Sequence, residues 1–259
     1  MRALMVKYTL LIVTYLKAYS KHPLEVFLKL IYLPVQMMMY YFLWINIGKS
    51  NTLDITYMIT YYLTISLLIH SYPSRHIALS VEQDVMEGTI TNCLVRPYSY
   101  IIPAFSKYIA WALIYFIIFI PSLVFITFYK GITLAQILYF IVATIVGKFV
   151  EFMLWFDIGL IALFIERIKG VIISANAIML FMSGSLIPLS FFPKWLINIT
   201  YFFPFRTFIY FPADILLSER STQYFILNIV IGLFWLILLT IISKLLFIKG
   251  VTQLQGNLS

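Results

Sequence analysis

The stretch that decides the fold class is QYFILNIVIGLFWLILLTIISKLLF, Gln223–Phe247. Lys244 is its only charged residue, and the stretch is longer than the about 20 residues that a helix needs to cross the hydrocarbon core of a bilayer. Its apolar residues are continuous and do not alternate with polar ones, as they would in a barrel strand. A helix can also satisfy its own backbone groups inside lipid. The stretch is therefore predicted to be a membrane-spanning helix.

Five earlier runs have the same character: Leu24–Ile47, Ile55–Tyr72, Tyr108–Tyr129, Leu134–Ile165 and Val171–Leu189. Across the whole chain 63% of the residues are apolar and 11% are charged, whereas charged residues make up about a quarter of a soluble domain. We therefore expect an all-α polytopic membrane protein with six transmembrane helices, in which residues 1–259 form one transmembrane domain. The lone Cys93 excludes an internal disulfide.

The basic residues indicate how the chain is oriented. They are scattered singly between the apolar runs, which is typical of contact with a lipid bilayer and not of nucleic-acid binding. If the N-terminus is cytoplasmic, eleven basic residues beside the spans lie on that side: Arg2, Lys7, Lys17, Lys21, Arg75, Arg96, Lys107, Arg167, Lys169, Lys244 and Lys249. Five lie outside: Lys49, Lys130, Lys194, Arg206 and Arg220. We therefore expect a multi-pass protein of the cell membrane with both termini in the cytoplasm.

The N-terminal residues 1–22 have an amphipathic pattern. Lys7, Lys17 and Lys21 share one helical face, and apolar residues lie largely on the other faces. This pattern predicts a helix that lies in the membrane interface. The alternative is an ordinary extension of the first span.

The longest polar stretch of the chain, residues 73–107, contains a second amphipathic pattern. Ile77, Val81 and Val85 recur at helical spacing, which predicts a short helix that ends near Gly88. In the expected orientation this helix is cytoplasmic. It is either a docking surface for a partner or a solvated connector.

Residues 190–222 are apolar and aromatic but rich in proline. Proline removes a backbone donor and breaks helices, so this stretch is predicted to form re-entrant pieces on the outer side. Pro188, Pro193 and Pro204 are the residues expected to shape this outer cap.

Three charged residues lie inside the fourth predicted span: Lys148, Glu151 and Asp157. Each such charge costs about 2.5–3.5 kcal/mol on insertion scales, so the three side chains should face protein or water. Lys148 and Glu151 are three residues apart, which predicts an ion pair on one helical face. The functional interpretation places all three along a substrate pathway or a permease interface. The structural interpretation is an internal pair, with Asp157 reaching toward the inner membrane surface.

Three short motifs resemble the permease subunits of type-2 ATP-binding-cassette (ABC) exporters, in the six-span bacterial and archaeal branch. The loop after the second span reads EGTITNCLVRP, Glu87–Pro97, and SGSLIPLSFFPKWL, Ser183–Leu196, follows the fifth span with Pro204 beyond it. Trp235 and the tail VTQLQGN, Val251–Asn257, resemble the family's closing signature, although Asn257 replaces the usual second glycine.

This resemblance implies a division of labour in which the chain builds the pathway and binds no cofactor. Two copies of a separate ATPase would hold ATP and magnesium, and a second permease copy or a related permease would complete the complex. The residues that would couple the ATPase to the spans are Val81, Glu82, Asp84, Val85, Glu87, Gly88, Leu94, Arg96 and Pro97. Gly48-Lys49-Ser50 is no phosphate-binding loop, because Leu43 stands where that loop needs glycine.

The expected function is export of an amphipathic or hydrophobic substrate, with ATP hydrolysis on the partner subunit. The main alternative is an ion-coupled secondary transporter in which Lys148, Glu151 and Asp157 relay protons, although no internal repeat of the kind found in such folds is evident. An enzyme is not expected, because no catalytic set or metal-ligand spacing is found.

Overall fold

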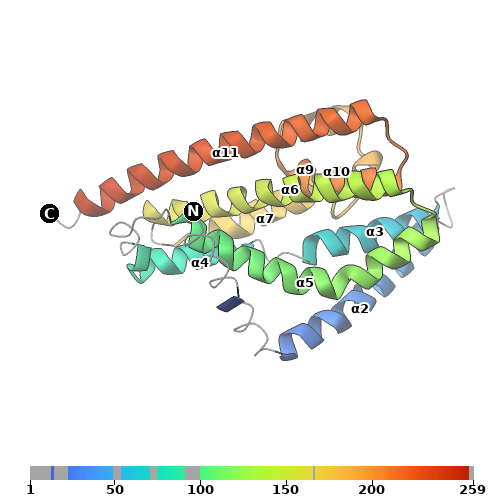
Figure 1. The fold of residues 1–259 in the computed structure, drawn as a ribbon, viewed down its shortest axis with the longest axis horizontal. Coiled ribbons are helices and arrows are strands. Elements are labelled where there is room, and N and C mark those ends of the chain that lie inside the picture. Colours follow the sequence, from blue (N-terminus) through green and yellow to red (C-terminus); the bar gives the residue numbers. More distant parts are fainter. Residues whose placement is uncertain are drawn as a thin grey trace.

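The computed structural model describes residues 13–14, 23–48, 54–70, 75–90, 100–165 and 167–256. Within these ranges the regular structure is entirely helical, which confirms the all-α part of the predicted fold class (Figure 1). The helices are α2 (Pro23–Gly48), α3 (Ile55–His70), α4 (Arg75–Met86), α5 (Ile101–Lys130), α6 (Leu134–Leu160), α7 (Lys169–Met182), α8 (Lys194–Thr200), α9 (Phe205–Phe208), α10 (Tyr210–Leu217) and α11 (Thr222–Gly256). Two short 3₁₀ turns are η2 (Ile161–Leu163) and η3 (Leu189–Phe191).

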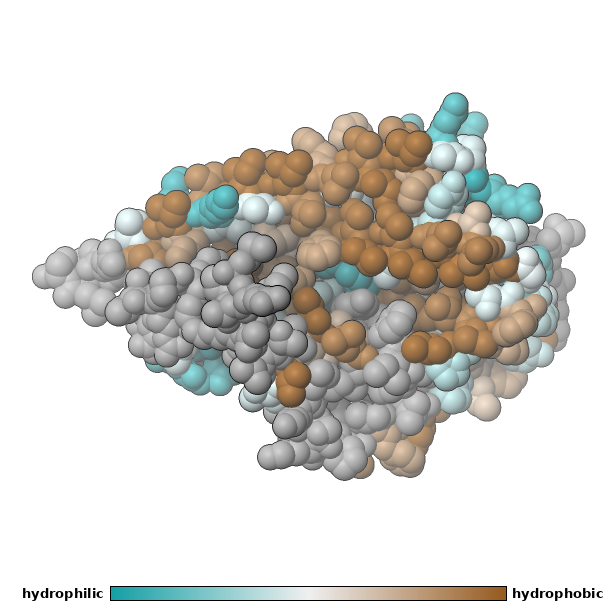
Figure 2. Space-filling model, viewed as in Figure 1, coloured by the Kyte–Doolittle hydropathy of each residue, from teal (hydrophilic) through white to brown (hydrophobic). Residues whose placement is uncertain are grey.

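The six apolar runs coincide with the helices α2, α3, α5, α6, α7 and α11. By length and apolar composition alone, two described helical stretches could cross a membrane, Leu134–Leu163 and Thr222–Gln253. Side chains on the face shown in Figure 2 are apolar over the middle of the long helices, and hydrophilic residues gather toward the ends. The described part of the chain is therefore all-helical with two helices of membrane-spanning length, and the count of six spans stays a prediction.

Helix α6 is the centre of the bundle. It packs against α11 along its length and also contacts α4, α9 and α10 (Figure 1). Gly147 allows the backbone of α9 to approach closely, because a Cβ atom there would lie 2.7 Å from the Cα atom of Phe208. The buried face of α6 carries the three charged residues discussed above.

The short helix α4 confirms the amphipathic pattern in the polar loop. Ile77 and Val81 are buried, and Val85 is half-buried against the same core. The helix ends at Met86, and Gly88 adopts φ +69° in the following turn. A positive φ is the usual way in which glycine terminates a helix.

Helix α7 ends earlier than its apolar run suggests. It stops at Met182, and Gly184 adopts φ +79° just beyond. Two hydroxyl groups of α3 donate hydrogen bonds to the carbonyl oxygens that this break leaves without helical partners. Tyr61 Oη lies 2.7 Å from Gly184 O, and Tyr62 Oη lies 2.7 Å from Leu186 O.

Residues 190–222 form short helices separated by prolines, as expected. Pro188, Pro193 and Pro204 each stand directly before a helical piece, η3, α8 and α9 respectively. The stretch from α9 through α10 is buried against α6 and α3. Its re-entry into the outer leaflet, and its closure of an outer pathway, stay predictions.

Two parts of the predicted organisation lie outside the residues that the structure describes. These are the interfacial helix in residues 1–22, of which only residues 13–14 are described, and the end of the polar loop with Leu94, Arg96 and Pro97.

Candidate functional site

The packing face of α4 lies directly on the backbone of α6. A Cβ atom on Gly159 of α6 would lie 2.7 Å from Val81 Cβ and 3.1 Å from Ala78 Cα. Contacts under 3.0 Å force a neighbour to shift, so glycine is the residue that permits this approach. Val81 is buried and faces the bundle, not the solvent, and Gly159 of α6 lies against it.

The two acidic residues of α4, Glu82 and Asp84, are bonded to other parts of the protein. Glu82 Oε1 accepts a hydrogen bond of 2.8 Å from the backbone N–H of Ile168, the residue that starts α7. A carboxylate at a helix N-terminus satisfies a free backbone donor and interacts favourably with the helix dipole. Asp84 accepts a hydrogen bond of 2.5 Å from Tyr100 Oη at the start of α5. Glu82 and Asp84 therefore tie α4 to two long helices.

Glu87 is the acidic residue that faces outward. It is exposed, and its Oε1 atom accepts a hydrogen bond of 2.6 Å from Gln83 Nε2. Met86 beside it is 59% exposed. Gln83, Met86, Glu87 and Gly88 thus form the exposed C-terminal end of α4, which we call the α4 tip. The tip is the part of the helix that a partner could contact directly.

A cleft with mixed polar and apolar walls separates α4 from the beginning of α5. Its polar wall residues include His76, Ser80, Asp84, Tyr100 and Lys107. Lys107 Nζ donates a hydrogen bond of 2.8 Å to Ser80 Oγ across this cleft. This bond and the Asp84–Tyr100 bond hold the two helices together at the same end of the bundle.

The predicted ion pair in the middle of α6 is present. Lys148 Nζ lies 2.7 Å from Glu151 Oε2, and both side chains are almost completely buried. Lys148 Nζ also donates a hydrogen bond of 2.5 Å to the carbonyl oxygen of Leu68 in the last turn of α3. A cation at a helix C-terminus is favourable, so the pair fastens α6 to α3. Its part in a substrate pathway or permease interface stays a prediction.

Asp157 lies one turn before the C-terminal end of α6. Its carboxylate accepts a hydrogen bond from Ser243 Oγ of α11, and its Oδ2 atom has no hydrogen-bond partner among the described residues. The residue is 6% exposed and lies between α6 and α11. Its position relative to the membrane surface and its part in a pathway or interface stay predictions. The three charged residues are not brought into one cluster.

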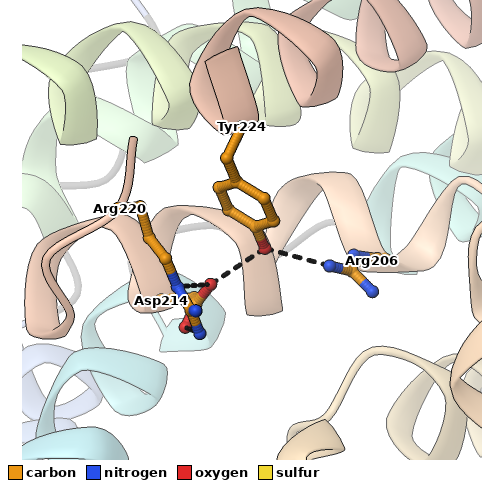
Figure 3. Close-up of polar contacts among 4 residues, drawn as sticks. All are labelled: Arg206, Asp214, Arg220 and Tyr224. Atoms are coloured by element: carbon orange, nitrogen blue, oxygen red, sulfur yellow. Dashed lines mark hydrogen bonds and ion pairs between the residues drawn. The ribbon is translucent and has the colours of Figure 1, made fainter. Parts of the chain in front are cut away.

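A second polar cluster lies in the proline-rich segment, and no pattern in the sequence indicated it (Figure 3). Asp214 of α10 accepts two hydrogen bonds from Arg220, of 2.7 and 3.0 Å, and a third of 2.8 Å from Tyr224 Oη. Arg206 of α9 donates a bond of 2.9 Å to the same hydroxyl oxygen. The hydrogen bonds to Asp214 raise the pKa of the Arg220 guanidinium above its usual range.

Comparison with known proteins identifies the family. The family model described as "ABC-2 family transporter protein" matches residues 30–257, from the first long helix through the last. A search of curated proteins finds no match. The matched range includes α4, α6, the proline-rich segment and α11, which carry the features described above. The chain therefore belongs to the ABC-2 family of transporter proteins, and it is a membrane-spanning transport component of the ABC permease type.

Proposed function

We propose that this chain is the permease subunit of an ABC exporter and that a separate ATPase docks on the α4 tip. The observation that carries the proposal is the combination of the family match with an amphipathic helix that is anchored on one face and exposed at its end. The ATPase would hold ATP and magnesium, and two copies would serve two permease chains. In this arrangement α4 and both termini are cytoplasmic.

The contacts of α4 support a route for the mechanical signal. Movement of the helix would act on α6 through the contact of Val81 with Gly159, and on α7 through Glu82. It would act on α5 through the bond between Asp84 and Tyr100. Docking of the ATPase would therefore move α5, α6 and α7 together. The C-terminal end of α7 leads into the proline-rich segment. Leu94, Arg96 and Pro97 stay predicted members of the same coupling element.

A groove between α5 and α6 supports the proposal that the substrate is amphipathic or hydrophobic. Its walls are mostly apolar and include Tyr108, Phe140, Ile145 and Phe149, with Lys148 at one position. Such a surface favours acyl or aromatic groups over strongly hydrated ones. The alternative of an ion-coupled transporter is less well supported, because the Lys148 ammonium group is held by an internal ion pair and a helix terminus.

The docking proposal is tested by co-purification of the cognate ATPase with variants of the α4 tip. Met86→Asp removes an exposed apolar contact and should weaken ATPase binding about tenfold or more, because burial of such a side chain contributes about 1.5–3 kcal/mol. Glu87→Lys should weaken it less, about fivefold at most, because exposed ion pairs contribute up to about 1 kcal/mol.

Glu219→Lys is the matched control, because Glu219 is also exposed but lies between α10 and α11. This variant should bind the ATPase like the natural chain. Unchanged ATPase binding by Met86→Asp, with the protein inserted in the membrane, would contradict docking on the α4 tip.

A further inference from the structure

Arg206 is a buried cation that has no carboxylate partner among the described residues. The residue is 5% exposed, and the ion pairs in this part of the chain are Lys148–Glu151 and Asp214–Arg220. Within the same ranges the hydroxyl of Tyr224 accepts a hydrogen bond from Arg206, and Arg206 Nε has no hydrogen-bond partner. A guanidinium group has five N–H donors, so most of the binding capacity of this group is unused.

The nearby acidic group cannot neutralise Arg206. Asp214 already accepts two hydrogen bonds from Arg220 and one from Tyr224 (Figure 3). The cluster of two guanidinium groups and one carboxylate therefore carries a net charge of +1, which is the sum of two positive charges and one negative charge. A buried charge is stable only when it is paired or well solvated by polar groups.

Two aromatic rings hold the guanidinium group in place. Arg206 Cζ lies 3.8 Å from the centroid of the Tyr201 ring and 5.1 Å from that of Tyr210. Cation–π contacts of this kind attract the guanidinium to the ring faces, and they orient the planar group without consuming its N–H donors. An oriented guanidinium with free donors matches the oxygen atoms of a phosphate or carboxylate.

Apolar side chains are exposed on the same segment. Phe202 is 77% exposed, and Phe203 beside it is also exposed and stacks on Phe205, the neighbour of Arg206, with ring centroids 5.8 Å apart. Trp195 of α8 is exposed as well. A cationic group next to exposed aromatic rings fits a ligand that has an anionic end and an apolar chain.

We propose that Arg206 is the anion-binding residue of a site for an anionic amphiphile in the proline-rich segment. The ligand has a phosphate or carboxylate group that accepts hydrogen bonds from Arg206 and an apolar chain that lies along Phe202 and Phe203. Either a lipid of the outer leaflet or the exported cargo supplies this chemistry. The placement on the outer side rests on the proposed function.

The test measures probe binding to the purified permease without its ATPase. The probes are dihexanoyl phosphatidylglycerol, which is anionic, and dihexanoylglycerol, which is neutral and has the same chains but no phosphate group. Native mass spectrometry should show that the natural chain binds the anionic probe about tenfold more tightly, the effect of one charge-assisted hydrogen bond. Arg206→Gln should abolish this preference, and Arg206→Lys should retain part of it.

Lys194→Gln is the matched control, since it removes one exposed positive charge from α8 in the same segment. The Lys194→Gln variant should still prefer the anionic probe. If it loses this preference as fully as Arg206→Gln does, general surface charge attracts the probe, and the proposed site at Arg206 is refuted. Absence of the preference in the natural chain would also overturn it, and this measurement does not depend on whether Arg206→Gln folds.

A second probe pair separates the two sources of the anion. Dodecyl phosphate and dodecyl maltoside have one chain each and serve as cargo-like probes, the first anionic and the second neutral. An Arg206-dependent preference for phosphatidylglycerol alone identifies a lipid headgroup, and a preference for dodecyl phosphate alone identifies a cargo-like anion. Loss of ATPase co-purification in the α4 tip variants is a separate result, so failure of one proposal is distinguishable from failure of the other.

Discussion

Replacement of Glu82 by alanine should loosen the start of α7 and leave the α4 tip intact. The change removes the 2.8 Å bond from the Ile168 backbone N–H to the Glu82 carboxylate. Hydrogen bonds to charged groups contribute about 1.5–3 kcal/mol, and Ile168 has no side chain that could cap its own helix. Since 1.4 kcal/mol corresponds to a factor of ten in an equilibrium constant, the Ile168 amide should exchange its hydrogen about tenfold faster or more.

Hydrogen–deuterium exchange of the purified permease, read on a peptide that contains Ile168, measures this effect. Glu87→Ala is the matched control, because Glu87 directly follows α4 and, among the described residues, its carboxylate bonds to Gln83 across one exposed turn. It should leave exchange at Ile168 unchanged, while Glu82→Ala should leave exchange at the α4 tip unchanged. Equal exchange at Ile168 in Glu82→Ala and in the natural chain would refute the role of Glu82 as the cap of α7.

Two further predictions concern the interior of α6. Lys148→Met or Glu151→Gln should each lower the thermal unfolding temperature of the purified permease, because removal of one partner of a buried pair costs about 3–5 kcal/mol. The double variant should be more stable than either single variant, and an additive loss would contradict the pairing. Gly159→Ala should displace α4 and lower the free energy of unfolding by about 1–3 kcal/mol through overpacking. The displaced α4 should bind the ATPase more weakly, which co-purification measures. Gly170→Ala, where a Cβ atom meets nothing within 4 Å, should leave that binding unchanged.

Local sequence patterns predicted the local features of the structure. The spacing of Ile77, Val81 and Val85 indicated α4, because burial on one side of a helix follows a period of 3.6 residues. The three-residue separation of Lys148 and Glu151 predicted their ion pair, because residues so placed share a helical face. The prolines predicted the breaks in the outer segment.

Features that depend on distant parts of the chain could not be predicted in this way. Glu82 meets Ile168, and Asp157 meets Ser243, each across 86 residues. No periodicity in a single helix specifies which face of another helix lies opposite. The sequence predicted Glu82 as a coupling residue, which stays a prediction, but gave no sign that it caps α7. Arg206 was counted only among the basic residues of the outer side, and its burial could not be predicted for the same reason.

The hydroxyl groups of Tyr61 and Tyr62 fasten the break after α7 to α3. Both donate to carbonyl oxygens in that break, those of Gly184 and Leu186, and the two tyrosines are neighbours on α3. A displacement of this end of α7 away from α3 therefore has to break two hydrogen bonds, at a cost of about 0.5–1.5 kcal/mol each.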